Sequence, residues 1–230
     1  MTSKAAFIDF ERVGKYIAGN RVAIVGSGPS VLSNAPGFVD SHDLVVRVNN
    51  FKTSEQAGFR TDIHYSFYGT SIRKTAEELK AGGVWMCLCK LPNSQPLESE
   101  WHWQNGKLVG IDFTYIYRNR AAWWFCDTFI PDDAHFLAKF ELLGKHQPTT
   151  GFAGILDVLA CEPRSVYLTG FDFFTSKIHN VDERWQEKNN GDPICHRPDL
   201  EAKWLRDNAH AHPITFDDAA QRLVFAKEAA

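Results

Sequence analysis

The sequence predicts an α/β fold with a mostly parallel sheet and helices on both faces. Three observations lead to this fold class. Short runs rich in Val, Ile and Leu recur along the chain, segments with apolar residues at helical spacing separate them, and a glycine turn closes the first run. Continuous apolar strands that alternate with helices are typical of parallel sheets buried on both faces. The length of 230 residues fits a single domain over residues 1–230.

The expected strands are short apolar runs that end at glycine or polar residues. In chain order they cover residues 21–25, 44–48, 62–65, 84–89, 165–169 and 213–216. Helices are expected at 71–80, 151–160 and 199–208, and another directly after the glycine turn. Pro198 stands at the first position of the helix at 199–208, where its missing N–H costs nothing.

Charge and cysteine content exclude several classes of protein. Lys plus Arg is 25 against 28 Asp plus Glu, so no basic field exists for a nucleic-acid backbone. Five cysteines are few and odd in number, which favours reduced thiols over a disulfide framework. Charges recur in the first 20 residues, so no signal peptide is predicted, and no apolar run is long enough for a membrane span. We expect a cytoplasmic protein, with peripheral membrane contact left open.

The turn after the first strand reads Gly26-Ser27-Gly28-Pro29-Ser30. A strand, glycine turn and helix bring backbone N–H groups toward one point, which suits a phosphate. A tight turn with no ligand, as in any α/β fold, would have the same sequence pattern. A dinucleotide site would add a third glycine near position 31 and a carboxylate after the second strand. Val31 and Asn49 stand there instead. Asn49 offers a donor and an acceptor to a ribose or a pyrimidine, so a different nucleotide is favoured.

Three segments together resemble the sialylmotifs of the family 29 sialyltransferases. V-A-I-V-G-S-G-P-S-V-L at 22–32, followed by V-D-S-H-D-L-V-V-R-V-N at 39–49, is similar to the long motif. P-T-T-G-F at 148–152, with V-Y-L-T-G-F-D at 166–172, is similar to the short motif. His196 and Glu201, separated by four residues, resemble the very short motif. The resemblance runs from residue 20 to residue 205, and residues 90–147 match no motif.

The resemblance implies a Rossmann-like domain of the variant GT-A glycosyltransferase type. It also implies an inverting transfer of sialic acid, or of a related ulosonic acid such as Kdo, from a CMP-linked donor to a glycan hydroxyl. The CMP-sugar is then a substrate and no cofactor is needed. A bacterial member that acts on lipopolysaccharide or capsule fits the missing membrane anchor.

The motifs also assign site residues by position. His196 matches the catalytic base and Glu201 its acidic partner, and His179 is a partial match to a third motif with a histidine. The nucleotide-binding positions are Gly26, Ser27, Gly28, Ser30, Asn49, Thr149, Thr150 and Gly151. Two departures stand out. Ser27 replaces the Asn that the family more often has, and Val22 replaces the long-motif cysteine, so no disulfide to Cys161 can form.

The chemistry of such a transfer agrees with these residue types. The acceptor hydroxyl loses a proton, and an imidazole that is neutral near pH 7 can take it. His196 precedes a predicted helix start, where the helix dipole disfavours the imidazolium. The chain contains no Asp-x-Asp, the pair that holds a divalent ion in metal-dependent GT-A enzymes, so we expect no metal in the reaction.

Other candidate residues have simpler structural explanations. Cys87 and Cys89, with His210-x-His212, could bind zinc, but buried thiols are favoured. The segment at 40–43 mixes titratable groups and is expected to be a structural turn. Two roles are open for the tryptophans at 101, 103, 123 and 124: they can stack on sugar rings or pack in the core. Contact with sugar carboxylates is open for Arg118 and Arg120.

Two other functions remain open at this point. One is a phosphate- or nucleotide-binding α/β protein of the pyrophosphokinase-like type, which would leave His196 and Glu201 without a role. The other is a non-catalytic module that binds CMP and does not respond to His196→Ala. The sequence does not indicate the donor sugar, the acceptor, the linkage or the oligomeric state.

Overall fold

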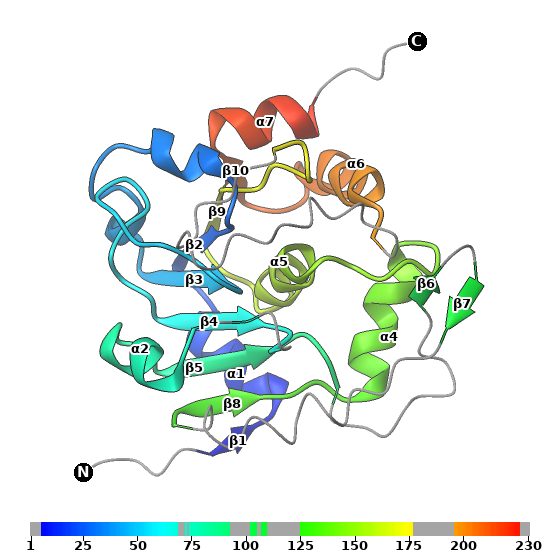
Figure 1. The fold of residues 1–230 in the computed structure, drawn as a ribbon, viewed down its shortest axis with the longest axis horizontal. Helices are drawn as coiled ribbons and strands as arrows, with labels where there is room; N and C mark the ends of the chain where they lie inside the picture. Colours follow the sequence, from blue (N-terminus) through cyan, green and yellow to red (C-terminus); the bar gives the residue numbers. More distant parts are fainter. Residues whose placement is uncertain are drawn as a thin grey trace.

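The computed structural model describes residues 6–68, 72, 74–92, 102–104, 107–109, 125–176 and 196–225, with only the backbone path at 102–104 and 107–109. One sheet has eight strands in the order β1-β8-β5-β4-β3-β2-β9-β10, and every neighbouring pair is parallel. Figure 1 shows them one above another, from β10 at the top to β1 at the bottom. The predicted parallel α/β architecture is therefore confirmed.

The elements follow one another along the chain as strands and short helices. The strands of the sheet are β1 (Phe7–Ile8), β2 (Arg21–Val25), β3 (Leu44–Val48), β4 (Ile63–Ser66), β5 (Met86–Cys89), β8 (Asp127–Phe129), β9 (Ser165–Thr169) and β10 (Ile214–Phe216). A separate antiparallel pair is formed by β6 (His102–Gln104) and β7 (Lys107–Val109). The helices are α1 (Phe10–Ile17), α2 (Ala76–Ala81), α4 (Asp133–Leu142), α5 (Thr150–Ala160), α6 (Pro198–Asn208) and α7 (Asp218–Val224), with 3-10 turns η1 (Pro29–Ser33) and η2 (Val39–Ser41).

Two helix predictions need correction. The helix expected at 71–80 begins only at Ala76, because Thr75 and Glu78 form a capping box that fixes its first turn. The segment after the glycine turn is the 3-10 turn η1 instead of an α-helix. Ser33 Oγ donates to the Ser30 carbonyl at 2.7 Å, and such local side-chain bonds compete with a continuing helix.

The sheet is covered on both faces. One face presents Ile24, Val46 and Tyr65 to a core that includes Val13 of α1 and Phe152 of α5. The opposite face packs in two smaller clusters, one against η1 and η2 and one against α2. Because both faces are buried, the ends of the strands are where side chains remain accessible to a ligand.

The strand order reverses next to β2. From β2 the chain proceeds outward through β3, β4, β5 and β8, whereas β9 and β10 lie on the other side of β2. In open parallel sheets, ligands bind outside the carboxyl ends of the strands at such a switch point. The loops after Val25 and Thr169 therefore define the position where a site is expected. Within the part of the chain that the structure describes, no helix has both the length and the apolar character needed to cross a membrane.

Candidate functional site

The glycine turn after β2 lies directly against the loop after β9. The N–H of Gly26 donates to the Thr169 carbonyl at 2.8 Å, and the N–H of Gly28 donates to the Gly170 carbonyl at 2.7 Å. A Cβ on Gly26 would lie 2.3 Å from the Gly170 oxygen. These two N–H groups thus have partners within the protein, and the assignment of Gly26 and Gly28 to nucleotide binding stays a prediction. The glycines are needed for the close approach of two backbones.

Ser27 keeps polar groups available in this turn. No described residue is a hydrogen-bond partner of its hydroxyl or its N–H, and the side chain is partly exposed. Ser30 is different, because its hydroxyl donates to Asp217 at 2.8 Å. Asp217 also accepts from the Thr169 hydroxyl at 2.8 Å and from the Gly170 N–H at 2.9 Å. Ser30 therefore has a structural bond to Asp217, whereas the hydroxyl of the partly exposed Ser27 has no partner among the described residues.

Phe171 connects the glycine turn to the start of α5. Its Cδ2 lies 3.5 Å from the position of a Cβ on Gly26, and its Cε1 lies 2.7 Å from that of a Cβ on Gly151. The two motif segments are thus separated by the width of one aromatic ring. The carboxyl carbon of Asp172 lies 3.3 Å from a Cβ position on Gly28, so this carboxylate also borders the turn.

Asn49 follows β3 and is held in a left-handed conformation, with φ of 51°. Its side-chain oxygen accepts from the Ser66 hydroxyl at 3.0 Å, and its carbonyl accepts from Nε2 of His64 at 2.8 Å. Because the oxygen is occupied, the side-chain N–H groups are what Asn49 can offer a ligand. Burial lowers the pKa of His64 to about 4, so this ring is neutral when it holds Asn49.

Thr149 caps the first turn of α5 and is held by Glu201. Its hydroxyl accepts from the Phe152 N–H at 3.1 Å and donates to Glu201 at 2.8 Å, and its own N–H donates to Glu201 at 2.6 Å. The first N–H groups of a helix have no partner within it. Those of Thr150 and Gly151 are therefore candidate donors to an anion at this end of α5.

Glu201 is 2% exposed, and burial raises its pKa to about 7, although the bonds from Thr149 and the charge of Lys90 act in the opposite direction. Both of its oxygens are used by Thr149. Glu201 therefore positions the start of α5, a role that the motif alone does not define.

His196 lies just before α6, as expected, and contacts the segment that leads to Thr149. Its Nδ1 is 2.8 Å from the carbonyl of Gln147. A carbonyl only accepts, so Nδ1 carries the proton and Nε2 is the basic nitrogen. The ring is nearly parallel to that of Phe174, at 15° and 6.3 Å between centroids. Burial and the charge of Lys90 lower the pKa of His196 to about 4, against the effect of the Gln147 bond.

Lys90 was missed by the sequence reasoning, which found no motif between residues 90 and 147. It follows β5 and is 4% exposed. Its N–H donates to the Ser66 carbonyl at 3.0 Å, next to the side chain that holds Asn49. A lysine directly after a buried strand was the available signal, because carboxyl ends of parallel strands share one edge.

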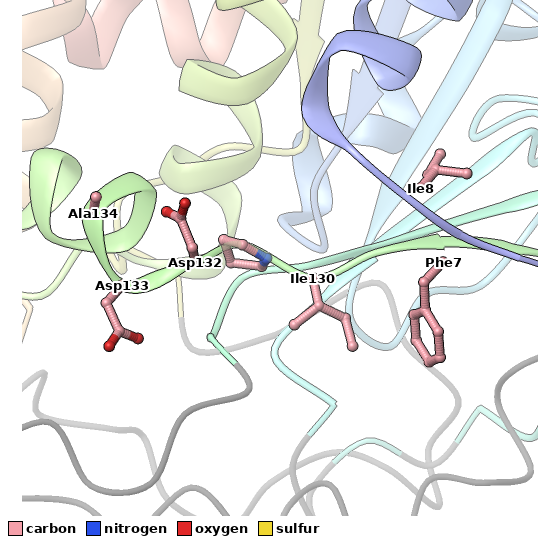
Figure 2. A pocket seen from close by; sticks show the side chains of 7 residues that line it. Phe7, Ile8, Ile130, Asp132, Asp133 and Ala134 are labelled. Atoms are coloured by element: carbon pink, nitrogen blue, oxygen red, sulfur yellow. The ribbon is translucent and has the colours of Figure 1, made fainter.

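Several predicted candidates lie outside the described residues. These are His179, the side chains of Trp101, Trp103, Trp123 and Trp124, and Arg118 and Arg120. A cavity of about 650 Å³ is lined by Phe7, Ile8, Ile130 and residues 131–134 (Figure 2). It lies at the β1 edge of the sheet, four strands or more from β2, and is therefore separate from the switch point.

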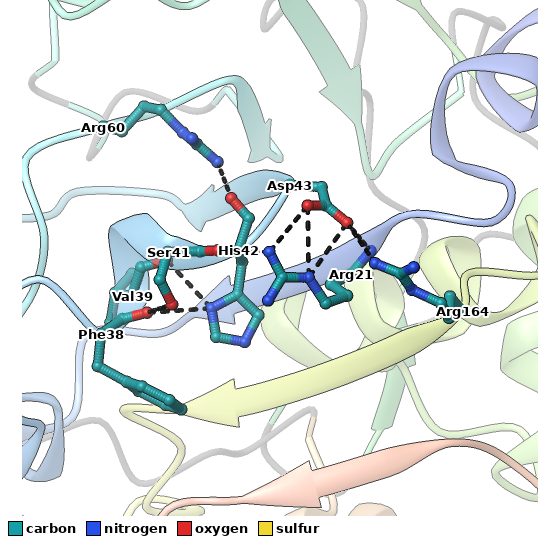
Figure 3. A network of polar contacts seen from close by, with 8 residues as sticks. All are labelled: Arg21, Phe38, Val39, Ser41, His42, Asp43, Arg60 and Arg164. Carbon is teal, nitrogen blue, oxygen red and sulfur yellow. Dashed lines mark hydrogen bonds and ion pairs between the residues drawn. The ribbon is translucent and has the colours of Figure 1, made fainter.

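The turn at 40–43 is structural, as expected. Asp43 accepts from Arg21 at 2.9 Å and from Arg164 at 3.0 Å, and the bonds from Arg21 lower the pKa of this carboxyl (Figure 3). Nδ1 of His42 lies 3.1 Å from the Val39 carbonyl. These contacts surround the starts of β2, β3 and β9, at the edge of the sheet opposite the glycine turn.

The four cysteines that the structure describes are also structural. Cys87 and Cys89 are buried, as predicted, and the Sγ of Cys126 lies 3.4 Å from that of Cys87. Cys161 is a free thiol whose pKa burial raises to about 12. In the described ranges, no three histidine, cysteine or acidic side chains are grouped to hold a metal ion. Transfer without a metal stays a prediction.

Solved structures provide the comparison with known proteins. The chain matches the α-2,3-sialyltransferase Cst-I from Campylobacter jejuni with a TM-score of 0.60 and 14% identity, over 98% of this chain and 84% of that chain. The fold is that of the sialyltransferases. Comparison with protein-family profiles and with curated proteins returns no match.

Two further structures agree. CstII from Campylobacter jejuni, in complex with the substrate analogue CMP-3FNeuAc, matches with a TM-score of 0.56 and 16% identity, over 86% of this chain and 81% of that chain. A mammalian sialyltransferase in complex with Gal-beta-1-3GalNAc-ortho-nitrophenol matches with a TM-score of 0.54 and 19% identity, over 88% of this chain and 71% of that chain. The GT-A-like fold inferred from the three motifs is thereby confirmed.

Proposed function

We propose that the protein transfers sialic acid or a related ulosonic acid, such as Kdo, from a CMP-linked donor to a glycan hydroxyl. The observation that carries this proposal is the bond between His196 and the Gln147 carbonyl, 2.8 Å long, two residues before Thr149. It brings the expected base to the start of α5, within a fold shared with sialyltransferases that bind CMP analogues. The residues from 1 to 230 then act as one glycosyltransferase domain.

Each candidate residue has its own role in this transfer. Nε2 of His196 accepts the proton of the acceptor hydroxyl, which attacks the anomeric carbon as its bond to the CMP oxygen breaks. Attack from the face opposite CMP gives inversion. The N–H groups of Thr150 and Gly151, together with Ser27, stabilise the anionic donor and the leaving phosphate. The side-chain N–H of Asn49 contacts the nucleoside. His179, the partial match to the third motif, is proposed as a further member of the site.

CMP is a weakly basic leaving group, so no general acid and no metal are required in this scheme. A cytoplasmic enzyme of lipopolysaccharide or capsule synthesis is supported by the reduced cysteines in the described residues. Its glycan acceptor would be presented at the membrane surface.

The test measures CMP release from CMP-sialic acid and CMP-Kdo side by side, with and without a glycan acceptor. His196→Ala should reduce the rate roughly 100-fold or more. His210→Ala is the matched control, because His210 is exposed at the end of α6, and it should retain the rate. Equal rates for His196→Ala and the wild type would exclude His196 as the base. A wild-type protein that neither binds CMP nor releases it from either donor would overturn the proposed function.

A further inference from the structure

Lys90 is a buried cation on the edge of the sheet that carries the candidate site. Its N–H bonds the carbonyl of Ser66 at 3.0 Å, and the Ser66 hydroxyl bonds Asn49 at 3.0 Å. Three neighbouring strands, β3, β4 and β5, therefore end in three linked residues: Asn49, Ser66 and Lys90. With 4% exposure, Lys90 cannot be explained as a solvated surface charge.

The charge of Lys90 reaches the other end of the site. It lowers the pKa of both His196 and Glu201, which come from the segment around α6. A single ammonium thus acts on residues from β5 and α6, which are far apart in the sequence. The backbone of Lys90 is thus linked to the expected nucleoside contact, Asn49, through Ser66, and its charge acts on the expected base, His196.

A bound donor would bring negative charge to a site that already has acidic groups at its border. Glu201 and Asp172 both border it, and each carboxylate already accepts bonds from backbone N–H groups. A CMP-ulosonate adds a phosphate and a carboxylate, so negative charge would accumulate in a partly buried space. Uncompensated charge of this kind is unfavourable. Neutral donors such as the N–H groups of α5 reduce the unfavourable energy but do not change the net charge.

We infer that Lys90 binds the negative charge of the CMP-linked donor between Asn49 and His196. This rests on the proposed function and adds a donor-binding residue that none of the three motifs contains. The phosphate and the sugar carboxylate share the chemistry that an ammonium recognises, and the two sources can be separated by the choice of ligand.

The experiment compares Lys90→Met, Lys90→Gln and Lys90→Arg in binding CMP and cytidine by calorimetry. The first two variants should lower the affinity for CMP roughly 10- to 100-fold and leave the affinity for cytidine unchanged, because only CMP carries the anion. Lys90→Arg should restore most of the affinity. Lys203→Met is the matched control, since it removes an exposed charge from α6 near Glu201 and should leave both ligands unchanged.

A second measurement separates the two anions. Unchanged CMP affinity with a raised KM for the CMP-linked sugar assigns Lys90 to the carboxylate and supports the inference. Equal losses for CMP and cytidine, or no change in CMP affinity and donor KM, would overturn it. In that case the proposed function still stands if the wild type binds CMP and transfers the sugar. If the wild type does not bind CMP, the proposed function itself is refuted.

Discussion

The carboxylate of Glu201 accepts two hydrogen bonds from one residue, Thr149, through its N–H at 2.6 Å and its hydroxyl at 2.8 Å. Helix α6 thereby fixes the first turn of α5. This arrangement keeps an acidic group, only 2% exposed, in an environment that raises its pKa to about 7. The groups that face it are Thr149, Lys90 and Asp199, of which Lys90 favours the ionised form and Asp199 disfavours it.

Glu201→Gln should change how stability depends on pH. The unfolded carboxyl loses its proton near pH 4.5, whereas the folded one keeps it until about pH 7. The folded state therefore binds more protons between these values, and this group's contribution to stability falls as the pH rises. Glutamine does not titrate. Between pH 5 and pH 8, the free energy of unfolding of the wild type should therefore fall by roughly 3 kcal/mol relative to that of the variant. Urea denaturation at both pH values measures this difference.

Asp199→Asn provides the control for that comparison. Asp199 lies on the same helix and is exposed, and the bond from Arg197 lowers its pKa. Its titration lies below pH 5, so its difference from wild type should be constant between pH 5 and pH 8. A constant difference for Glu201→Gln as well would show that burial does not raise the pKa of Glu201.

His196 should titrate far below an ordinary histidine. Burial and Lys90 lower its pKa to about 4, so Nε2 is unprotonated throughout the neutral range. A bound anion acts in the opposite direction to Lys90, and CMP should raise this pKa by about one unit or more. NMR titration of the ring with and without CMP measures both values, with His196→Asn to assign the resonance. A midpoint near 6.5 in the free protein, or no change with CMP, would contradict this prediction.

The sequence predicted the centre of the sheet better than its edges. Strands β2, β3 and β9 have the predicted bounds, because most of their residues are β-branched or apolar and glycine or polar residues flank each run. Strands β1 and β8 have two and three residues, and each depends on pairing with its neighbour. Such short segments carry no recognisable period. Helix α4 was missed because Lys139 interrupts its apolar pattern, and this lysine is buried against Asp157 at 2.6 Å.

The site was predicted only where a motif supplied a position. Thr149, Glu201 and His196 are brought together by hydrogen bonds between α5, α6 and the segments that precede them. Lys90 and Asp217 lie outside the motifs, and their contacts with the site arise from the order of the strands. The bonds from the Gly26 and Gly28 N–H groups to Thr169 and Gly170 could not be predicted, because the sequence of a glycine turn does not show whether it faces a ligand or another backbone segment.

Gly26→Ala should destabilise the fold through a backbone clash. The new Cβ would lie 2.3 Å from the Gly170 oxygen, and neither backbone segment can move without breaking the bonds between β2 and β9. We expect the free energy of unfolding to fall by more than about 2 kcal/mol. Gly14→Ala is the control, because apart from the local backbone of α1 nothing lies within 4 Å of its Cβ position. Gly14→Ala should raise the free energy of unfolding by roughly 0.5 to 1 kcal/mol. Similar stabilities of the two variants in urea denaturation would show that the turn is not tightly packed.

Asp217→Ala should weaken CMP binding although Asp217 does not face the ligand. Its Oδ2 accepts from Ser30, Thr169 and the Gly170 N–H, and its Oδ1 accepts from the Ala220 N–H and so caps α7. Removing it leaves buried donors without partners, at a loss of roughly 2 to 4 kcal/mol of unfolding free energy. Gly170 supports the glycine turn, so the CMP affinity should fall in the same variant.

Asp218→Ala removes the neighbouring carboxylate, which is exposed in the first turn of α7. It should leave both the stability and the CMP affinity within the error of wild type, because surface substitutions of this kind have small effects. Calorimetry with CMP at a temperature where both variants remain folded separates the two effects. If Asp217→Ala lowers the melting temperature and binds CMP as wild type does, CMP binding does not depend on this network and the prediction is wrong.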